Sequence, residues 1–369
     1  MKILYDHQIY ALQKFGGINR YFDEIIQTQK DGFETARIDP QFFTPIQAAP
    51  RMDLLSRGVR FLKRKAGVPE KKGDPGLLPP QIAALFARSD FDIFHPTYYD
   101  PYFLVHTDKP FVLTVYDMIH EIFRDYFTWD DPVSHHKMML CEKAAQIIAI
   151  SQKTKDDLVT ILRVPEEKVH VIPLASTFDA VSPLKPAGME GVERYILFTG
   201  NRWGYKNFYF PVLALADILK SDPQLKLVCT GPPFETWELQ IFEDQGIGRQ
   251  IHHIYLNNDQ TLSWMYRNAA LFIFPSLYEG FGFPLLEAFG SDCPVISSTG
   301  GSLPEVAGDA ALYFEPRSFA QIQEAASRVL YDPSLRTELI ARGRERFRLF
   351  SWDRCRTETI EVYKKVLRS

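Results

Sequence analysis

The chain has 369 residues, of which 46% are apolar and 24% are charged, with 42 Lys and Arg against 46 Asp and Glu. This length exceeds one ordinary hydrophobic core and suits two domains of a globular protein. The net charge of −4 gives no support to nucleic-acid binding by charge. Four cysteines without a CxxC pair argue against a disulfide framework or a zinc site and favour a reduced cytosolic compartment.

The sequence carries no pattern of a secreted or membrane-spanning protein. No apolar stretch reaches the roughly 18 residues that mark a spanning helix. The first residues run directly into an apolar stretch and lack the basic segment of a signal peptide. We therefore expect a cytoplasmic protein.

Short apolar runs alternate with helix-period segments along the whole chain. In the first half, strands are predicted at 3–5, 93–95, 111–116, 147–150 and 169–172. In the second half, strands are predicted at 195–199, 225–229, 251–254, 271–274, 294–297 and 311–314. Helices are predicted at 208–219, 262–269, 321–330 and 352–367. This alternation predicts βαβ units and parallel sheets covered on both faces.

A segment rich in proline and glycine, 176–193, is the predicted domain boundary. It separates a first α/β domain at 1–180 from a second at 190–350. In tandem open sheets, ligands bind in the crevice at the carboxyl ends of the strands.

Gly16 and Gly17 precede a helix that is predicted to begin near Ile18. The pair does not fit GxGxxG, so a dinucleotide fingerprint is absent. Two adjacent glycines still allow the backbone to approach a ligand phosphate closely, and an ordinary flexible turn is the alternative.

Residues 51–72 form a basic segment in a chain of net negative charge. The segment contains eight Lys or Arg and two acidic residues, a local charge of +6. Its apolar residues fall on one helical stripe: Met52, Leu55, Val59, Leu62 and Ala66. A basic amphipathic helix predicts contact with an anionic membrane surface. The alternative is a helix packed on its own domain with a solvated basic face.

Polar residues follow two predicted strands of the first half. Asp117 and His120 come after strand 111–116, at the end where ligands bind in open sheets. His120 is a candidate for a ligand pocket, and a structural histidine is the alternative. His95 ends another strand and either faces the cleft or packs in the core.

Arg202 and Lys206 follow strand 195–199. Arginine offers a planar fork to phosphate oxygens and lysine a point charge. Both could stabilise the negative charge of a phosphate group. A solvated basic turn is the alternative.

The most informative segment is 275–289, PSLYEGFGFPLLEAF, which follows a buried strand and opens a helix. Glycine at 280 and 282 allows a sharp turn, and free N–H groups at the helix start suit a diphosphate. Glu279 and Glu287, with seven residues between them, could each accept hydrogen bonds from neighbouring hydroxyls of a sugar and a ribose. A plain strand–turn–helix with solvated acids is the alternative.

The segment YEGFGFPLLEA resembles the E-x7-E signature of retaining glycosyltransferase family 4, whose members have the GT-B fold. Further segments resemble that family in the same order along the chain: FGGINRYF at 15–22, FTGNRWGYKN at 198–207, GGSLPEVAGDAALYFEP at 300–316 and FSWDRC at 350–355. The resemblance covers nearly the whole chain and is specific for fold and reaction class.

The resemblance implies an α/β protein of the GT-B type, with two Rossmann-like domains facing a central cleft. The C-terminal helix, about 352–369, would pack back on the first domain. Glu279 would contact the donor sugar and Glu287 the ribose. The nucleotide-sugar would also be held by the donor-site residues Gly16, Gly17, Arg202, Lys206, Gly280, Phe281, Gly282, Phe283 and Leu285.

The catalytic candidates are Glu279, Asp117, Lys206, Arg202 and His120. Tyr116 stands where the family usually has histidine, next to Asp117, so the resemblance makes His120 a candidate for the acceptor pocket instead. The implied reaction moves a hexose from a UDP-, GDP- or dTDP-sugar to a saccharide or lipid-linked saccharide acceptor, with retention of configuration. It would serve polysaccharide, O-antigen or glycolipid synthesis.

No residue stands out as a covalent nucleophile, so the donor phosphate is expected to assist the incoming hydroxyl. No clustered His or Cys set is visible, so we expect no metal and no cofactor beyond the nucleotide-sugar. The enzyme could sit peripherally on the inner face of the plasma membrane. A GT-B nucleotide-sugar epimerase and a non-catalytic carbohydrate-binding relative are the alternatives.

Overall fold

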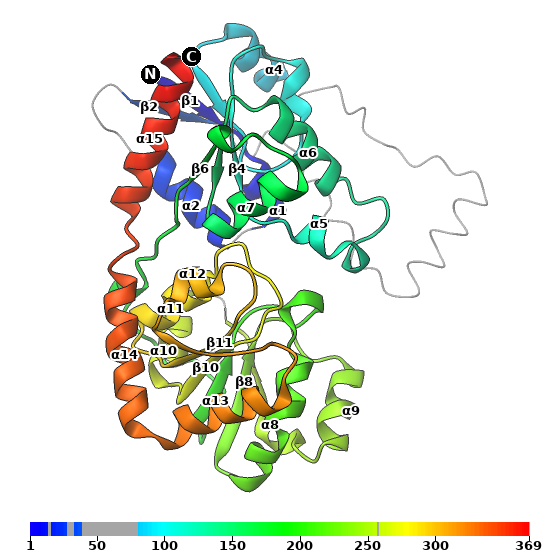
Figure 1. Cartoon of the computed structure of the whole chain (residues 1–369), viewed down its shortest axis with the longest axis vertical. Coiled ribbons are helices and arrows are strands. Elements are labelled where there is room, and N and C mark those ends of the chain that lie inside the picture. The colour runs from blue at the N-terminus through cyan, green and yellow to red at the C-terminus, as the bar shows by residue number, and fades with distance from the viewer. Residues whose placement is uncertain (14–15, 28–32, 39–79, 257, 369) are drawn as a thin grey trace, which may run out of the picture. The chain divides into compact units, whose positions relative to one another are not determined.

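The computed structural model describes residues 1–13, 16–27, 33–38, 80–256 and 258–368 (Figure 1). The predicted basic helix in 51–72 lies outside these residues. The chain divides into two compact units. Unit 1 comprises Met1–Thr114, Pro132–Ile148 and Thr359–Ser369, and unit 2 comprises Val115–Asp131 and Ala149–Glu358.

Unit 1 is built around a parallel sheet with the strand order β2-β1-β3. Its strands are β1 (Lys2–Tyr5), β2 (Glu34–Arg37) and β3 (Ile93–His95). Its helices are α1 (Gln8–Leu12), α2 (Gly17–Ile26), α4 (Pro80–Arg88) and α6 (Val133–Lys143). Three further strands form a sheet of order β4-β5-β6: β4 (Val112–Val115), β5 (Gln146–Ala149) and β6 (Val169–Val171).

Strand β2 was not predicted from the sequence. Its residues, ETAR, lack an apolar run, and its side chains are half-buried or exposed. It pairs with β1 at the edge of the sheet, where one side of a strand has no neighbour and polar side chains are tolerated.

The core of unit 1 contains a chain of buried hydroxyl and imidazole groups. Tyr363, from helix α15 (Trp352–Arg368), lies 2.9 Å from the Tyr5 hydroxyl and 2.6 Å from His95 Nδ1. The other imidazole nitrogen lies 2.9 Å from the Thr114 hydroxyl. His95 is fully buried, and burial lowers its pKa to about 3. It is therefore a core residue that joins the C-terminal segment to the sheet.

Unit 2 contains a six-stranded parallel sheet with the order β12-β11-β10-β7-β8-β9. The strands are β7 (Arg194–Phe198), β8 (Leu225–Thr230), β9 (Ile251–Ile254), β10 (Leu271–Phe274), β11 (Val295–Ser298) and β12 (Ala311–Phe314). The runs in β7 and β10, YILF and LFIF, are almost wholly buried, as expected for a parallel sheet covered on both faces.

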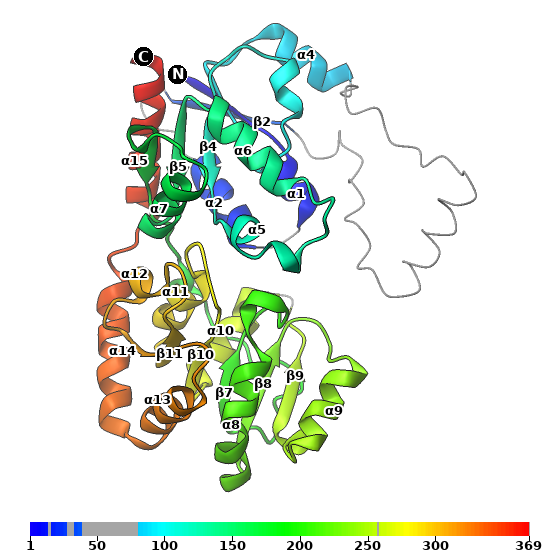
Figure 2. The same cartoon turned by 45° about the vertical axis from the view of Figure 1, so that its right-hand side comes forward.

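Helices flank this sheet on both faces (Figures 1 and 2). They are α8 (Tyr209–Ser221), α9 (Thr236–Asp244), α10 (Asp259–Asn268), α11 (Phe283–Gly290), α12 (Leu303–Ala307), α13 (Phe319–Tyr331) and α14 (Pro333–Phe347). Helices α8 and α13 pack together over one core cluster. Burial of each large apolar side chain in such a cluster contributes roughly 1.5–3 kcal/mol.

Side-chain caps set two of the helix starts. Ser151 accepts a hydrogen bond from the Thr154 amide at 3.0 Å and caps α7 (Gln152–Ile161). Asn258 accepts one from the Thr261 amide at 2.8 Å, so α10 begins three residues before the predicted start at 262. The cap and the first turn are polar and escape a search for apolar periodicity.

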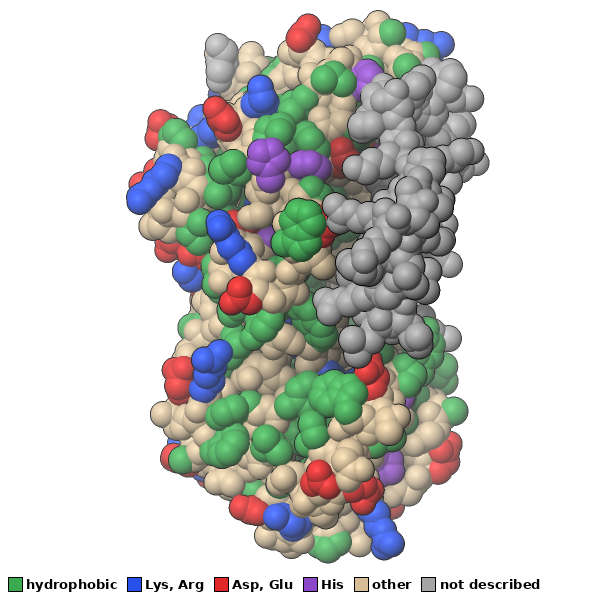
Figure 3. All heavy atoms as spheres, turned by 90° about the vertical axis from the view of Figure 1, so that its right-hand side faces the viewer, with side chains coloured by type: hydrophobic (Ala, Val, Ile, Leu, Met, Phe, Trp, Pro, Cys, Tyr) green, Lys and Arg blue, Asp and Glu red, His purple; other side chains and the backbone are tan. Residues whose placement is uncertain are grey.

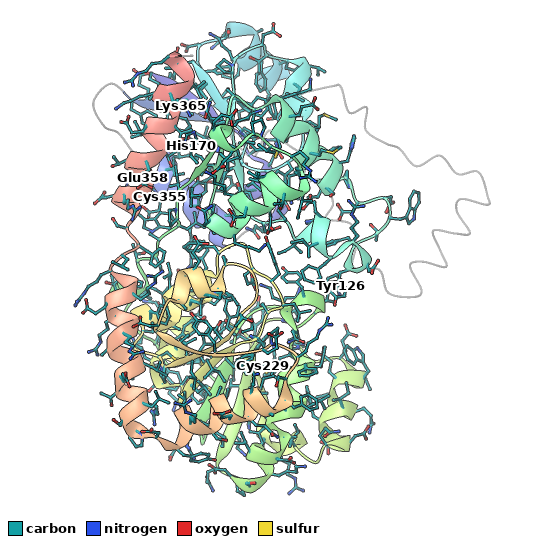
Figure 4. The ribbon with its side chains drawn as sticks, in the orientation of Figure 1. Tyr126, His170, Cys229, Cys355, Glu358 and Lys365 are labelled. Atoms are coloured by element: carbon teal, nitrogen blue, oxygen red, sulfur yellow. The ribbon has the colours of Figure 1, made fainter. Side chains whose placement is uncertain are left out.

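The described surface mixes charges of both signs. On the face drawn in Figure 3, apolar side chains lie in groups among acidic and basic ones. All four cysteines lie among the described residues as buried thiols, and Cys229 belongs to β8 (Figure 4). Among the helices that the structure describes, none combines the length and apolar composition needed to cross a bilayer.

Candidate active site

The order of the six-stranded sheet marks one position for a ligand. The chain runs outward from β7 to β8 and β9, then returns to β10 on the other side of β7. Open α/β sheets bind ligands at such a switch point, outside the carboxyl ends of the two diverging strands. The loops that leave β7 and β10 carry Lys206 and Glu279, so topology alone brings these two side chains together.

Lys206 and Glu279 form an ion pair at this point. The ammonium Nζ of Lys206 donates to Glu279 Oε1 at 2.7 Å, and the lysine side chain is 23% exposed. Burial alone would lower the pKa of Lys206, but the charge of Glu279 and the nearby Tyr205 and Asp117 raise it. The ammonium therefore stays charged and is available to an anionic ligand.

The loop that carries Glu279 is held rigidly. The Ser276 hydroxyl donates to Glu279 Oε1 at 2.5 Å. The Ser302 amide donates to the Glu279 carbonyl at 3.0 Å, and the Ser302 hydroxyl lies 3.0 Å from the carbonyls of Glu279 and Phe281. This support fixes the carboxylate before any ligand binds.

Gly280 allows a second loop to approach Glu279. A Cβ atom at position 280 would lie 1.8 Å from the Tyr116 carbonyl oxygen and 2.8 Å from Asp117 Cβ. No side chain fits there, so Asp117 is brought beside the loop of Glu279. Asp117 Oδ1 accepts a hydrogen bond from the Ile119 amide at 3.0 Å, which begins helix α5 (Ile119–Ile122).

Glu287 belongs to a separate part of the site, in the second turn of α11. Its Oε2 accepts a hydrogen bond from the Tyr266 hydroxyl at 3.2 Å. That hydroxyl lies 3.1 Å from Thr199 Oγ1, at the end of β7. The carboxylate is thus positioned beside the carboxyl end of β7, where it could accept hydrogen bonds from the hydroxyls of a ribose.

Helix α11 begins as predicted at its glycine turn. Gly282 is the N-cap, with φ +104°, a left-handed conformation that favours glycine, and Pro284 occupies the first turn. The side chains of Phe281 and Leu285 are buried, so only their backbone could contact a ligand. The Leu285 amide already donates to the Gly282 carbonyl at 2.9 Å. Phe283 packs its ring toward Phe281 and Trp352.

Arg202 has partners other than the predicted phosphate. Its Nε and Nη2 donate to the two Glu238 oxygens at 2.7 and 3.1 Å. Nη1 and Nη2 also donate to the carbonyls of Pro232 and Pro233, at 2.7 and 3.0 Å. The guanidinium lies 4.4 Å from the centre of the Phe234 ring, and the side chain is 5% exposed. In this conformation Arg202 ties β7 to the loop before α9.

His120 lies among aromatic rings. Its ring stacks on Phe127 with centroids 3.9 Å apart, and its Nε2 lies 3.8 Å from Asp131 Oδ2. Both the structural and the acceptor-pocket interpretations of His120 are compatible with these contacts.

Gly16 and Gly17 belong to unit 1. Gly17 is the first residue of α2 and Gly16 is its N-cap. Gly16 has extended backbone angles, so its conformation alone does not require glycine. Their predicted contact with the donor phosphate stays a prediction.

Several residues around the site were not predicted. Ser276 and Tyr266 donate hydrogen bonds to Glu279 and Glu287, Tyr205 raises the pKa of Lys206, and Thr199 lies within hydrogen-bond distance of Tyr266. Thr199, Tyr205 and Ser276 lie in the segments that follow β7 and β10, and Tyr266 reaches the site from α10. Across the described ranges, no group of three or more His, Cys, Asp or Glu side chains is arranged to hold a metal ion.

Comparison with known proteins identifies the family. The model of "Glycosyltransferase Family 4" matches residues 15–175, and that of "Glycosyl transferases group 1" matches residues 185–346. Together they extend over most of the chain, in the order that the motifs indicate. The predicted resemblance is therefore confirmed.

Individual relatives agree. The O-antigen chain mannosyltransferase B of Escherichia coli is 29% identical over 235 residues, 60% of this chain and 61% of its own length. The MMP alpha-(1->4)-mannosyltransferase of Mycolicibacterium hassiacum is 26% identical over 302 residues, 76% of this chain and 72% of its own length. The match thus spans about three fifths of the first relative.

A solved structure supports the fold. Anabaena Alr3699/HepE, in complex with UDP and glucose, superposes with a TM-score of 0.71 at 16% identity over 99% of both chains. The predicted α/β fold of the GT-B type is confirmed. The chain belongs to glycosyltransferase family 4, with the parallel α/β architecture of the GT-B fold.

Proposed function

We propose that this protein is a retaining glycosyltransferase that moves a hexose from a nucleotide-sugar to a saccharide or lipid-linked saccharide in polysaccharide or O-antigen synthesis. The observation that carries the proposal is the Lys206–Glu279 pair at the switch point between β7 and β10, 2.7 Å apart. Mannose is the first candidate sugar, because three relatives, at 29%, 26% and 24% identity, are mannosyltransferases.

Each charged group has a chemical task in this proposal. Lys206 stabilises the negative charge that develops on the leaving nucleoside diphosphate, as a preorganised cation does in a water-poor site. Glu279 accepts hydrogen bonds from hydroxyls of the donor sugar, and Glu287 from the ribose. Asp117 lies beside the loop of Glu279 and orients the reacting sugar.

The proposed reaction assigns one substrate to each predicted domain. Residues 190–350 bind the nucleotide-sugar, and residues 1–180 bind the acceptor. The donor phosphate assists the incoming hydroxyl, so that the new glycosidic bond forms on the face that the diphosphate leaves. The fixed positive charge of Lys206 replaces the divalent ion that other transferases use.

The test is a donor panel. UDP-glucose, GDP-mannose and dTDP-glucose are each incubated with and without a mannose-terminated oligosaccharide, and the products are followed by NMR. The proposal predicts that one donor is consumed faster with acceptor and that the anomeric configuration is retained. Conversion of a donor to an epimer without acceptor would identify an epimerase, and binding without turnover would identify a carbohydrate-binding relative.

The basic segment 51–72 gives a separate proposal about location, from its sequence alone. Each Lys or Arg near an anionic surface contributes about 1 kcal/mol, and salt screens the effect. We expect co-sedimentation with anionic vesicles at low salt, lost when Arg60, Lys63 and Arg64 are changed to glutamate. If the wild-type protein stays in the supernatant at low salt, the segment is only a solvated surface.

A further inference from the structure

A group of aromatic side chains lies beside the candidate active site in unit 2. We define the aromatic cluster as Phe123, Tyr126, Phe127, Trp203 and Tyr205. Ring centroids are 5.6 Å apart for Phe123 and Tyr126, 5.8 Å for Tyr126 and Trp203, and 6.3 Å for Phe127 and Trp203. Figure 4 labels Tyr126, on the loop that follows α5.

The cluster is connected to the charged residues of the site. The Tyr205 ring lies 6.1 Å from the Phe123 ring, and its centre is 5.1 Å from Lys206 Nζ. Phe123 also lies 6.3 Å from Tyr278, the neighbour of Glu279 in sequence. An unbroken series of rings therefore begins at the Lys206–Glu279 pair and leads away from it.

The outer part of the cluster faces solvent. The Trp203 side chain is 49% exposed, although a folded chain gains by burying so large a ring. Tyr126 packs on the adjacent turn, where a Cβ atom at Gly204, with φ +57°, would lie 3.3 Å from the Tyr126 ring. The turn is thus shaped to hold these rings side by side at the surface, and exposed apolar groups of this kind commonly mark binding sites.

Charge narrows the class of ligand. Residues 115–131, which supply three of the five rings, contain five acidic residues and one arginine. Such a segment disfavours an anionic lipid surface. Aromatic faces carry partial negative charge and attract the slightly positive C–H groups of a sugar ring, while polar neighbours accept its hydroxyls. The stacked pair of His120 and Phe127, beside Asp131, combines both features.

We propose that the aromatic cluster is the subsite for the saccharide part of the acceptor, with Trp203 and Tyr126 as its main stacking surfaces. This inference rests on the proposed transferase function. It assigns acceptor recognition to neutral sugar rings instead of a lipid or a charged headgroup. It also extends the acceptor site beyond residues 1–180 to Trp203 and Tyr205, next to Lys206 and Glu279, where the donor sugar is transferred.

The test compares Trp203→Ala and Tyr126→Ala with Trp237→Ala. Trp237 is a matched control, because it is 50% exposed on α9 and contacts a single tyrosine ring, that of Tyr209, at 5.0 Å. We expect the KM for a mannose-terminated oligosaccharide to rise about tenfold in the first two variants, as the loss of one aromatic contact implies. Donor hydrolysis without acceptor and nucleoside diphosphate affinity should not change, and Trp203→Phe should restore most of the acceptor affinity.

An unchanged KM in both variants, or an equal rise in Trp237→Ala, would overturn the proposal. A binding readout keeps it testable if no donor is turned over. Mannotetraose is titrated against intrinsic tryptophan fluorescence, and the change seen in the wild type should disappear in Trp203→Phe. No response in the wild type contradicts the subsite. Loss of anionic-vesicle binding in Trp203→Ala, with oligosaccharide binding kept, would show that the cluster contacts membrane and would also contradict it.

Discussion

Two ion pairs of unit 2 use side chains from the loop after β7. They have the same N–O distance and differ in burial and in their other partners. Arg202–Glu238 and Lys206–Glu279 both have an N–O distance of 2.7 Å. The Arg202 pair is almost completely buried, with side chains 5% and 3% exposed, and the Lys206 pair is 23% and 11% exposed. The two pairs are therefore distinguished by their exposure and not by their N–O distance, and only the Lys206 pair is exposed enough for a ligand to reach.

The partners explain the difference. The Tyr209 hydroxyl also donates to Glu238 at 2.6 Å, and the Glu235 amide donates to it at 2.7 Å, so the carboxylate and the Arg202 guanidinium satisfy each other within the fold. Burial alone would raise the pKa of Glu238, but the bonds from Arg202, Tyr209 and Glu235 hold it below its ordinary value. Among the residues that the structure describes, the Lys206 ammonium donates to one carboxylate, which leaves donor capacity for a phosphate.

The largest expected effect is on turnover by Lys206→Ala. The variant loses the cation that stabilises the leaving diphosphate, so kcat should fall about 10²–10³-fold, as for removal of one preorganised charge-stabilising donor. Thermal unfolding should change little, because the pair is partly exposed. Initial rates with a saturating donor are measured for the variant and for Lys220→Ala.

Lys220 is a suitable control because it forms an exposed ion pair with Asp217 at 2.9 Å on α8. Its removal should leave kcat unchanged. Equal rates for Lys206→Ala and the wild-type protein would remove Lys206 from the mechanism.

Arg202→Ala should change stability more than activity. Removal of one partner of a buried pair leaves the other charge uncompensated and costs about 3–5 kcal/mol. The double variant Arg202→Met with Glu238→Leu should recover much of this loss, since no charge remains buried. Thermal and denaturant unfolding measure both variants.

The pH dependence adds a check on the Arg202 pair. The lowered pKa of Glu238 means that the pair stabilises the fold above the unfolded-state pKa of glutamate, about 4.3. That contribution is lost as the pH falls through the folded-state pKa. The difference in stability between wild type and Arg202→Ala should therefore narrow in acid. A stable Arg202→Ala with a greatly reduced kcat would instead support the phosphate role predicted from sequence.

The two glutamates of the motif should separate binding from turnover. Glu287→Ala removes a charged acceptor of ribose hydroxyls, so the Kd for the nucleoside diphosphate should rise about 10–100-fold. Glu279→Ala should lower kcat with that Kd mostly kept. Calorimetric titration and initial rates distinguish the two, and a normal Kd in Glu287→Ala would contradict its assignment to the ribose.

The smallest expected effect is that of chelation. Lys206 supplies the positive charge at the phosphates, so EDTA should leave the rate unchanged. A rate that EDTA abolishes and a divalent ion restores would show that a metal, and not Lys206, carries this charge.

Much of the fold was accessible from sequence because parallel strands buried on both faces leave unbroken apolar runs. Strands β3, β9, β10 and β12 agree with the prediction at both ends. The exception is β2, an edge strand whose polar residues leave no such signal. The glutamate and lysine loops were also accessible, because they follow the ends of strands that the apolar runs define.

Contacts between residues far apart in the sequence could not be predicted from it. Arg202 meets Glu238 across 36 positions, and Tyr266 meets Glu287 across 21, so no local pattern reveals either pair. The basic character of Arg202 predicted a phosphate ligand, while the fold supplies a buried carboxylate. The aromatic cluster did leave a signal in the sequence. Four aromatic residues, Phe123, Tyr126, Phe127 and Trp129, fall within seven positions, and three of them belong to the cluster.

The most direct test of the central claim is a crystal structure of the protein with the nucleoside diphosphate selected by the donor panel. The account predicts that Lys206 Nζ lies within hydrogen-bond distance of a phosphate oxygen and that the Arg202–Glu238 pair is unchanged. A structure in which Arg202 leaves Glu238 to bind the phosphates, while Lys206 remains paired with Glu279 alone, would contradict it.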